Sequence, residues 1–295
     1  MVEIHAVDIA DPIRTQAILR RYGFKFKKSL GQNFLTNQRV LTEIVDAADL
    51  QPTDLVVEIG PGIGSLTEQL ARRVQQVVAV EIDSRLIPIL DETMAPYDNV
   101  QVINQDILQT DLKTLIAPYP DHGAIKVVAN LPYYITTPIM FRLIEGEIQP
   151  DRLVLMMQKE VAQRITSGPK SKHYGSLSVS VQTQMATNIA AIVPKTSFVP
   201  QPNVDSAVLV LQRYLESPYQ ISEPELFNKI VTSSFQQRRK SLQNNLCTLF
   251  GKDQRPQIIE IIAALELPAQ VRAEQLTINQ FNQLTDLCAQ RLAKH

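Results

Sequence analysis

Residues 56–70, with the sequence VVEIGPGIGSLTEQL, decide the fold of this chain. The stretch begins inside a short apolar run that is typical of a buried parallel strand. Three of the chain's ten glycines follow within five residues, which indicates a backbone that turns tightly or touches a ligand. Ser65 then opens a run that is compatible with a helix. A strand, a glycine turn and a helix N-terminus form a cradle for a nucleotide-like ligand.

The turn lacks the two common phosphate-binding motifs. A dinucleotide fingerprint that starts at Gly60 needs a third glycine where Ser65 stands, and no Gly-Lys-Ser/Thr sequence of a P-loop follows. Instead, Glu58 precedes the turn, where a carboxylate suits a cationic or amine-bearing ligand. Glu81 ends the next predicted strand, where it can accept hydrogen bonds from both ribose hydroxyls of an adenosine. These residues predict an S-adenosylmethionine site; the alternative is an ordinary turn between a strand and a helix.

Length and composition bound the class of protein. A chain of 295 residues predicts one large domain and a smaller one, and the 44% hydrophobic and 20% charged content is typical of a globular protein. With no apolar run of 18 residues and no secretory signal, we expect a cytoplasmic protein without a membrane partner. Cys247 and Cys288 are expected to be reduced core residues, and the scattered histidines predict no metal site.

Basic residues gather in two clusters although the net charge is only −1. The two clusters are residues 20–28, RRYGFKFKK, and residues 236–240, QQRRK. The loop 167–178, SGPKSKHYGSLS, carries further basic residues that suit backbone phosphates. A basic run interleaved with aromatics is typical of a surface that binds phosphates and stacks bases, and the alternative is a solvated arm. The predicted RNA contacts are Lys25, Lys27, Lys28, Lys170, Lys172, Arg238, Arg239 and Lys240.

Strand and helix patterns alternate through the first two thirds of the chain. The strands are predicted at 55–59, 76–82, 100–103, 125–129, 153–158, 179–185 and 207–212. This alternation predicts an α/β fold with a doubly wound, mostly parallel sheet. Beyond a proline-containing change in composition, only helical patterns follow. The predicted parts are an N-terminal extension and basic arm (1–28), a catalytic Rossmann-like domain (29–213), a linker (214–224) and a small all-helical domain (225–295).

The sequence NLPY at 130–133 directly follows a predicted strand. An exocyclic base nitrogen is a poor nucleophile because its lone pair is delocalised into the ring. Acceptors aimed at its hydrogens favour rehybridisation, and the Asn130 side-chain oxygen and a main-chain carbonyl beside Pro132 supply them. Tyr133 offers a face on which a base can stack. We expect Phe198 to be a second wall of this base site; the alternative is a core aromatic that anchors a loop.

Asp106 follows the third predicted strand, at the edge of the sheet where open α/β folds bind ligands. Its carboxylate is expected to accept the exocyclic amine of the cofactor's adenine. The alternative is an N-terminal cap of the following turn.

From about residue 27 to residue 287, the chain resembles the small-subunit ribosomal RNA adenine dimethyltransferases of the KsgA type. The motifs that carry the resemblance are KKSLGQNFL, VEIGPGIGSLT, Glu81, Asp106, NLPYYI, PKSKHYGSLSV, FVPQPNVDSAV and FQQRRKSLQNNL. It implies a class I methyltransferase fold, S-adenosylmethionine as donor, and dimethylation of two adjacent adenosines near the 3′ end of 16S rRNA during 30S biogenesis. The implied cofactor contacts are Asn33, Leu35, Gly60, Glu81, Asp106 and Asn130. The implied target-base residues are Asn130, Leu131, Pro132, Tyr133 and Phe198.

Two other functions stay open at this point. The related 23S rRNA methyltransferases that confer macrolide resistance share the cofactor motifs, but the motifs FVPQPNVDSAV and FQQRRKSLQNNL favour the small-subunit family. A protein of a different class, a ribosome-assembly factor that chiefly binds the immature subunit, is compatible with the same residues. We expect a monomer.

Overall fold

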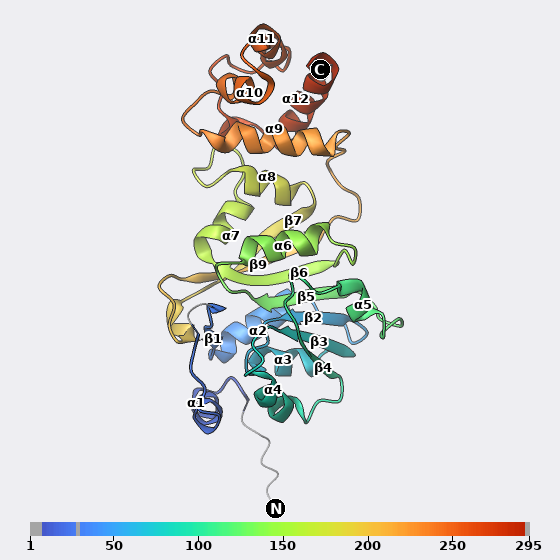
Figure 1. The fold of residues 1–295 in the computed structure, drawn as a ribbon. Coiled ribbons are helices and arrows are strands. Elements are labelled where there is room, and N and C mark those ends of the chain that lie inside the picture. Colours follow the sequence, from blue (N-terminus) through green and yellow to red (C-terminus); the bar gives the residue numbers. More distant parts are fainter. Residues whose placement is uncertain (1–7, 28–29, 293–295) are drawn as a thin grey trace, which may run out of the picture. The chain divides into compact units, whose positions relative to one another are not determined.

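The computed structural model describes residues 8–27 and 30–292 (Figure 1). Two compact units are present: Met1–Ala162 with Asn188–Arg213, and Gln163–Thr187 with Tyr214–His295. We retain the predicted catalytic and helical domains as a proposal, with one difference. Residues 163–187 group with the helices of the second unit, although they lie within the predicted catalytic domain.

A seven-stranded sheet, within the described part of the chain, forms the centre of the first unit (Figure 1). Its strand order is β4-β3-β2-β5-β6-β9-β7. From β4 to β6 all neighbours run parallel, and β9 pairs antiparallel with β6. The strands are β2 (Leu55–Ile59), β3 (Gln76–Glu81), β4 (Val100–Asn104), β5 (Ile125–Asn130), β6 (Arg152–Gln158), β7 (Met185–Val193) and β9 (Ser206–Arg213). The chain winds outward in opposite directions from β2 and β5, so the carboxyl ends of these two strands flank the switch point where such sheets bind ligands.

Helices connect the strands of the first unit. They are α1 (Pro12–Arg21), α2 (Gln38–Ala47), α3 (Ser65–Ala71), α4 (Ile87–Met94), α5 (Leu112–Ile116), α6 (Thr136–Glu145) and α7 (Lys159–Thr166), which crosses the division between the units. A separate two-stranded ladder pairs β1 (Phe34–Leu35) with β8 (Phe198–Val199).

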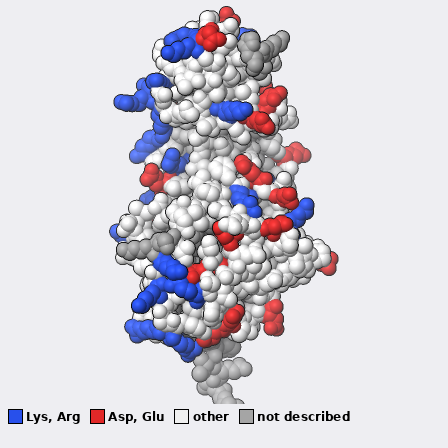
Figure 2. Space-filling model, viewed as in Figure 1, with Lys and Arg blue, Asp and Glu red and all other residues white. Residues whose placement is uncertain are grey.

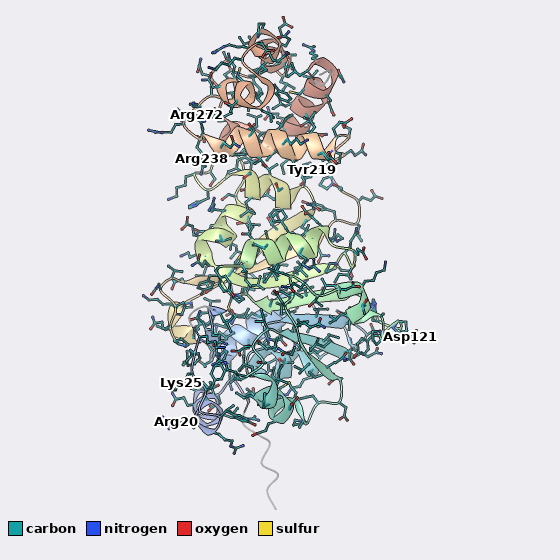
Figure 3. The ribbon with its side chains drawn as sticks, viewed as in Figure 1. Arg20, Lys25, Asp121, Tyr219, Arg238 and Arg272 are labelled. Carbon is teal, nitrogen blue, oxygen red and sulfur yellow. The ribbon has the colours of Figure 1, made fainter. Side chains whose placement is uncertain are left out.

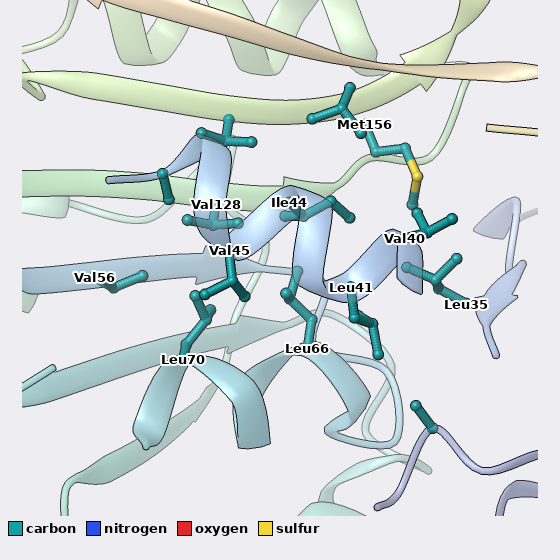
Figure 4. Close-up of a cluster of buried hydrophobic side chains, with 14 of the residues drawn as sticks. Leu35, Val40, Leu41, Ile44, Val45, Val56, Leu66, Leu70, Val128 and Met156 are labelled. Carbon is teal, nitrogen blue, oxygen red and sulfur yellow. The ribbon is translucent and has the colours of Figure 1, made fainter. Parts of the chain in front are cut away.

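The helix α2 covers the sheet with an apolar stripe. Asn37 begins it, because its side-chain oxygen accepts the Val40 N–H (3.3 Å) and satisfies a donor that the helix leaves open. Figure 4 shows the stripe against α3 and against strands β2 and β5. The buried side chains of the stripe are Val40, Leu41, Ile44 and Val45. Each contributes about 1.5–3 kcal/mol through burial.

The predicted strand at 179–185 is wrong, because Ser176–Gln182 forms helix α8. Valine and serine alternate there with the period of a strand, but local hydrogen bonds favour the helix. The Gly175 N–H donates to the Ser178 hydroxyl (3.0 Å) and closes the first turn. The Gln182 amide donates to the Ile165 carbonyl (2.7 Å) and holds the other end.

Helices α9 (Pro224–Gln236), α10 (Leu242–Phe250), α11 (Arg255–Ala264) and α12 (Ile278–Arg291) surround the core of the second unit. Cys247 and Cys288 are free and buried there, as predicted, and burial raises the pKa of the Cys288 thiol to about 12. The described residues contain no group of side chains arranged to hold a metal. Among the described helices, none is long and apolar enough to span a membrane.

Candidate active site

A pocket opens at the carboxyl ends of β2, β3 and β5 in the first unit. Its wall combines the glycine turn, the segment around β1, the residues after β3 and β4, and the start of the NLPY sequence. The predicted residues that line it are Asn33, Leu35, Gly60, Glu81, Asp106, Asn130, Leu131, Pro132 and Tyr133. Residues that are far apart in the chain therefore share one cavity.

The glycine turn has a left-handed backbone that explains its composition. Gly60 has a φ of 72° and Gly62 a φ of 63°, a region that side chains with a Cβ rarely adopt. A Cβ on Gly62 would also lie 3.1 Å from the Phe34 ring. The Gly62 N–H donates to the Glu81 carboxylate (3.2 Å), so the turn and the tip of β3 are joined directly.

Glu81 is buried at the pocket wall and is held by backbone donors. It accepts the N–H groups of Asp83 (2.8 Å) and Gly62 (3.2 Å). Burial raises its pKa to about 7, and these two hydrogen bonds oppose the rise. Asp83 is paired with the Arg85 guanidinium (Nε–Oδ1 2.9 Å), and this bond lowers the pKa of the Asp83 carboxyl. The carboxylate of Glu81 is thus oriented for a ligand with hydroxyl donors.

The N-terminal arm is held on the loop after β3. Gln32 donates to Asp83 (2.7 Å), and Arg85 donates to the Lys25 carbonyl (2.9 Å). The Arg85 guanidinium also lies 4.8 Å from the centre of the Phe24 ring. These contacts connect the arm to the segment that carries Asn33 into the pocket. Phe24 and Lys25 of the arm are therefore packed against the loop after β3 and are not part of a fully solvated segment.

Basic side chains of the arm remain exposed. Figure 2 shows Lys and Arg gathered over α1, whose last turn carries Arg20 and Arg21, and Figure 3 labels Arg20 and Lys25 on this side. Lys25 and Lys27 are exposed, and Lys28 lies outside the described residues. Lys25 and Lys27 are therefore accessible to a ligand.

Asn130 is the last residue of β5 and is oriented by the segment opposite. Its side-chain nitrogen donates to the Asn33 carbonyl (3.0 Å), while its side-chain oxygen accepts no hydrogen bond from the described residues. The Pro132 carbonyl is already engaged by Ile135 (3.2 Å) and Thr136 (3.1 Å). Of the main-chain carbonyls beside Pro132, the Leu131 carbonyl is therefore the better candidate for an acceptor.

The Tyr133 ring is fixed at its far end. Its hydroxyl forms a 2.6 Å hydrogen bond with the Ser206 hydroxyl at the start of β9. Burial raises the pKa of Tyr133, which therefore stays neutral at physiological pH. A neutral ring held at one edge can serve as a stacking face.

Asp106 lines the pocket and also caps the turn that follows it. Its Oδ1 accepts the Leu108 N–H (2.9 Å), as the alternative interpretation predicts. The two roles are compatible because a carboxylate has more than one acceptor site.

Phe198 does not line the pocket. It is 3% exposed and packs in the same core cluster as Leu35, its partner in the β1–β8 ladder. This position agrees with the alternative interpretation, a core aromatic that anchors a loop, and the role of Phe198 as a second stacking wall stays a prediction.

Three further residues of the site were not predicted from the sequence. Gln32 and Ile82 line the pocket, and Ser206 holds Tyr133. Ile82 is an apolar side chain that is 49% exposed, directly after the predicted ribose carboxylate. The position of Ile82 directly after Glu81 could have predicted its place in the pocket. Gln32 and Ser206 could not be predicted in this way, because their partners Asp83 and Tyr133 are distant in the sequence.

In the second unit, the predicted RNA contacts separate into two kinds. Lys170, Lys172, Arg239 and Lys240 are exposed. Arg238 is exposed as well, but it also donates to the carbonyls of Lys172 (3.0 Å) and Tyr174 (2.8 Å) and so holds the loop (Figure 3). Its contribution to any RNA surface is therefore partly structural.

The fold and the pocket define the class of protein. A doubly wound sheet carries a glycine turn, a ribose-type carboxylate at the next strand and an Asn-Leu-Pro-Tyr sequence at β5. These are the parts of a class I methyltransferase that uses S-adenosylmethionine. The pocket residues fit that cofactor, because the cavity is lined by three acidic residues, Glu58, Glu81 and Asp106, and the described residues that line it include no lysine or arginine to oppose a positively charged ligand.

Comparison with known proteins identifies the family. The family model for ribosomal RNA adenine dimethylase matches residues 23–290. Ribosomal RNA small subunit methyltransferase A of Latilactobacillus sakei subsp. sakei (strain 23K) is 56% identical over 283 residues, which cover 95% of each chain. The protein of that name from Lactococcus lactis subsp. lactis (strain IL1403) is 50% identical over 97% of this chain and 98% of the relative.

Two solved structures of rRNA or adenosine methyltransferases are also similar to this chain. A dimethyladenosine transferase from Plasmodium falciparum has a TM-score of 0.72 at 25% identity, over 85% of this chain and 95% of that one. The 23S rRNA methyltransferase ErmE has a TM-score of 0.68 at 26% identity, over 86% and 99%. This chain belongs to the ribosomal RNA adenine dimethylase family. Its reaction is the transfer of methyl groups from S-adenosylmethionine to adenine in ribosomal RNA.

Proposed function

We propose that this protein dimethylates N6 of two adjacent adenosines near the 3′ end of 16S rRNA, in the 30S subunit or its precursor. The two relatives described above are both named as small-subunit methyltransferases and match almost the whole chain, which favours the 16S target over the 23S one. The protein works in the cytoplasm as a monomer and takes part in 30S biogenesis.

The proposed cofactor site uses pocket residues from several segments. When bound, S-adenosylmethionine supplies an electrophilic methyl group on a sulfonium. Glu81 accepts the ribose hydroxyls, because its two backbone donors leave further acceptor sites on the carboxylate. Asp106 accepts the adenine amine. Asn33, Leu35 and Gly60 complete the wall, and Asn130 borders both the cofactor and the target base.

One observation carries the catalytic proposal: the oriented amide of Asn130. The Asn33 carbonyl fixes the amide nitrogen (3.0 Å) and leaves the amide oxygen and the Leu131 carbonyl as acceptors for the two hydrogens of the target N6. The hydrogen bonds localise the lone pair of N6 and favour its attack on the methyl group. Pro132 restricts the backbone, and Tyr133 stacks on the base. This mechanism works by positioning and electrostatics and needs no general base with a tuned pKa.

The substitution Asn130→Ala tests this proposal. We expect it to abolish methylation of 30S subunits that lack the modification, while subunit binding stays within about twofold, because affinity resides mainly in phosphate contacts. Asn188→Ala, an exposed position of β7, is the matched control and should methylate normally. Loss of binding with Asn130→Ala would mean that the NLPY sequence shapes the docking surface. Full binding without methylation by the unaltered protein would identify an assembly factor instead of an enzyme.

A further inference from the structure

Tyr134 is an exposed aromatic residue to which the proposed mechanism gives no task. It directly follows the NLPY sequence and is 56% exposed. Among the described aromatic residues, Tyr134 and Tyr22 alone are exposed, and Tyr22 is the less exposed of the two, at 37%. The Tyr22 hydroxyl donates to Glu92 (2.6 Å), so that ring has a task within the fold. The exposed ring of Tyr134 instead retains apolar area that a ligand can cover.

The ring of Tyr134 lies at the rim of the pocket. Gly31 and Pro132 both line the pocket, whereas Tyr134 is not among the described residues that line it. A Cβ placed on Gly31 would lie 3.5 Å from two carbons of the Tyr134 ring and 3.4 Å from the Cβ of Pro132. Tyr134 and Pro132 therefore both lie against Gly31. The ring is supported by a residue of the pocket wall but remains largely open to solvent.

The backbone around Tyr134 is held in a tight turn. The Pro132 carbonyl accepts the Ile135 N–H (3.2 Å) and the Thr136 hydroxyl (3.1 Å) across it. Tyr133, the preceding residue, lines the pocket. Consecutive Cα atoms are about 3.8 Å apart, so groups that contact the two rings lie close to each other. One tyrosine thus serves the pocket, and the next one serves the surface beside it.

A nucleobase that enters the pocket leaves its neighbour in the strand without a stacking partner on one side. This loss of stacking costs free energy, which an aromatic side chain at the rim can offset. The neighbour is joined to the target by a single sugar–phosphate link and therefore stays near the rim. Every base has a π face, so such a contact needs no particular sequence.

We propose that the ring of Tyr134 stacks on the nucleobase next to the one that is methylated. Because the two target adenosines are adjacent, this neighbour is itself an adenine in one of the two methylation sites. The contact holds the RNA strand at the rim while Tyr133 stacks on the target base. This inference rests on the RNA target of the proposed function and adds a second base contact to it.

Two substitutions separate the ring of Tyr134 from its hydroxyl. Tyr134→Ala should lower kcat/KM for methyl transfer to 30S subunits that lack the modification by about tenfold, which lies within the range for one base-stacking side chain. Tyr134→Phe keeps the ring and should retain kcat/KM within about twofold. The affinity for S-adenosylmethionine, measured by titration calorimetry, should be the same in both variants and in the unaltered protein. Far-UV circular dichroism establishes that the variants are folded.

A change in the RNA provides the second part of the test. The 30S subunits are reconstituted with 16S rRNA in which one or the other of the two adenosines is an abasic residue. Methylation of the remaining adenosine is compared with its methylation in intact rRNA. For one of these two substrates, the unaltered protein should lose about tenfold in kcat/KM, and Tyr134→Ala should lose no more than that in total. The two changes are then non-additive, because they remove the same contact.

Several results would overturn the inference. Losses that multiply to about a hundredfold with both substrates would show that Tyr134 and the neighbouring base act independently. An equal loss in Tyr134→Phe would assign the effect to the hydroxyl, and weaker cofactor binding in Tyr134→Ala would assign the ring to support of Gly31. In all these cases the unaltered protein still forms dimethyladenosine in intact 16S rRNA. Its failure to do so would overturn the proposed function itself.

Discussion

Replacing Gly62 with alanine should destabilise the empty protein more than the same change at Gly60. Both glycines have positive φ angles, 63° and 72°. Their surroundings differ. The one atom within 4 Å of a Cβ at Gly60 would be the carbonyl oxygen of Asn130, at 3.8 Å. At Gly62 it would lie 3.1 and 3.2 Å from ring carbons of Phe34, which is itself buried. Gly60→Ala is therefore the control for the cost of backbone conformation alone.

The magnitudes follow from these contacts. A left-handed backbone costs alanine about 1–2 kcal/mol, and the lower entropy of the unfolded chain returns about 0.4–1 kcal/mol. Gly60→Ala should therefore lower the free energy of unfolding by about 1 kcal/mol. Overpacking against an aromatic ring adds about 1–3 kcal/mol, so Gly62→Ala should lower it by about 2–4 kcal/mol.

Urea unfolding without cofactor, followed by far-UV circular dichroism, measures both values. The double variant Gly62→Ala with Phe34→Leu removes the ring and should recover about 1 kcal/mol relative to the sum of the single changes. Equal losses for the two alanine variants would show that Phe34 moves aside freely. That result would refute the expectation that the ring of Phe34 leaves no room for a Cβ at Gly62.

Three further predictions follow from other contacts. Lys126 and Asp54 form a buried ion pair (2.7 Å), so Lys126→Met should lower the free energy of unfolding by about 3–5 kcal/mol. Adding Asp54→Asn to this variant should restore much of the lost stability. A loss below about 1 kcal/mol for Lys126→Met would contradict the prediction. Tyr133→Phe removes the 2.6 Å hydrogen bond to Ser206 and should reduce kcat/KM for methyl transfer about fivefold, while cofactor affinity stays unchanged. An unchanged kcat/KM would mean that the ring of Tyr133 does not need the hydrogen bond to Ser206. Replacing Arg239 and Lys240 with glutamine should weaken binding to 16S rRNA. It should also reduce the slope of log affinity against log salt concentration by about two units. An unchanged slope would mean that the two side chains belong to a solvated surface.

Much of the sheet could be predicted because its strands are short apolar runs with clear ends. The predicted strand 55–59 coincides with β2, and the other parallel strands differ by one residue at an end. Residues 176–182 were missed because serine alternates there with valine, and only the local hydrogen bonds of Gly175 and Gln182 favour the helix. Grouping of residues 163–187 with the second unit depends on tertiary contacts, which the sequence does not reveal.

The site was predictable wherever its chemistry lies within one motif. The glycine turn and the NLPY sequence are each a short run of adjacent residues, and both line the pocket. Contacts between distant segments could not be foreseen, such as Gln32 with Asp83 or Tyr133 with Ser206. The position of Phe198 depends on the β1–β8 ladder, whose register decides that the ring faces the core.

The most direct test of the central claim is methyl transfer from labelled S-adenosylmethionine to 30S subunits that lack the modification, followed by nucleoside analysis of the rRNA. The account predicts N6,N6-dimethyladenosine in 16S rRNA, and none with the Asn130→Ala variant. Label that appears only in 23S rRNA, or no label at all despite tight subunit binding, would contradict it.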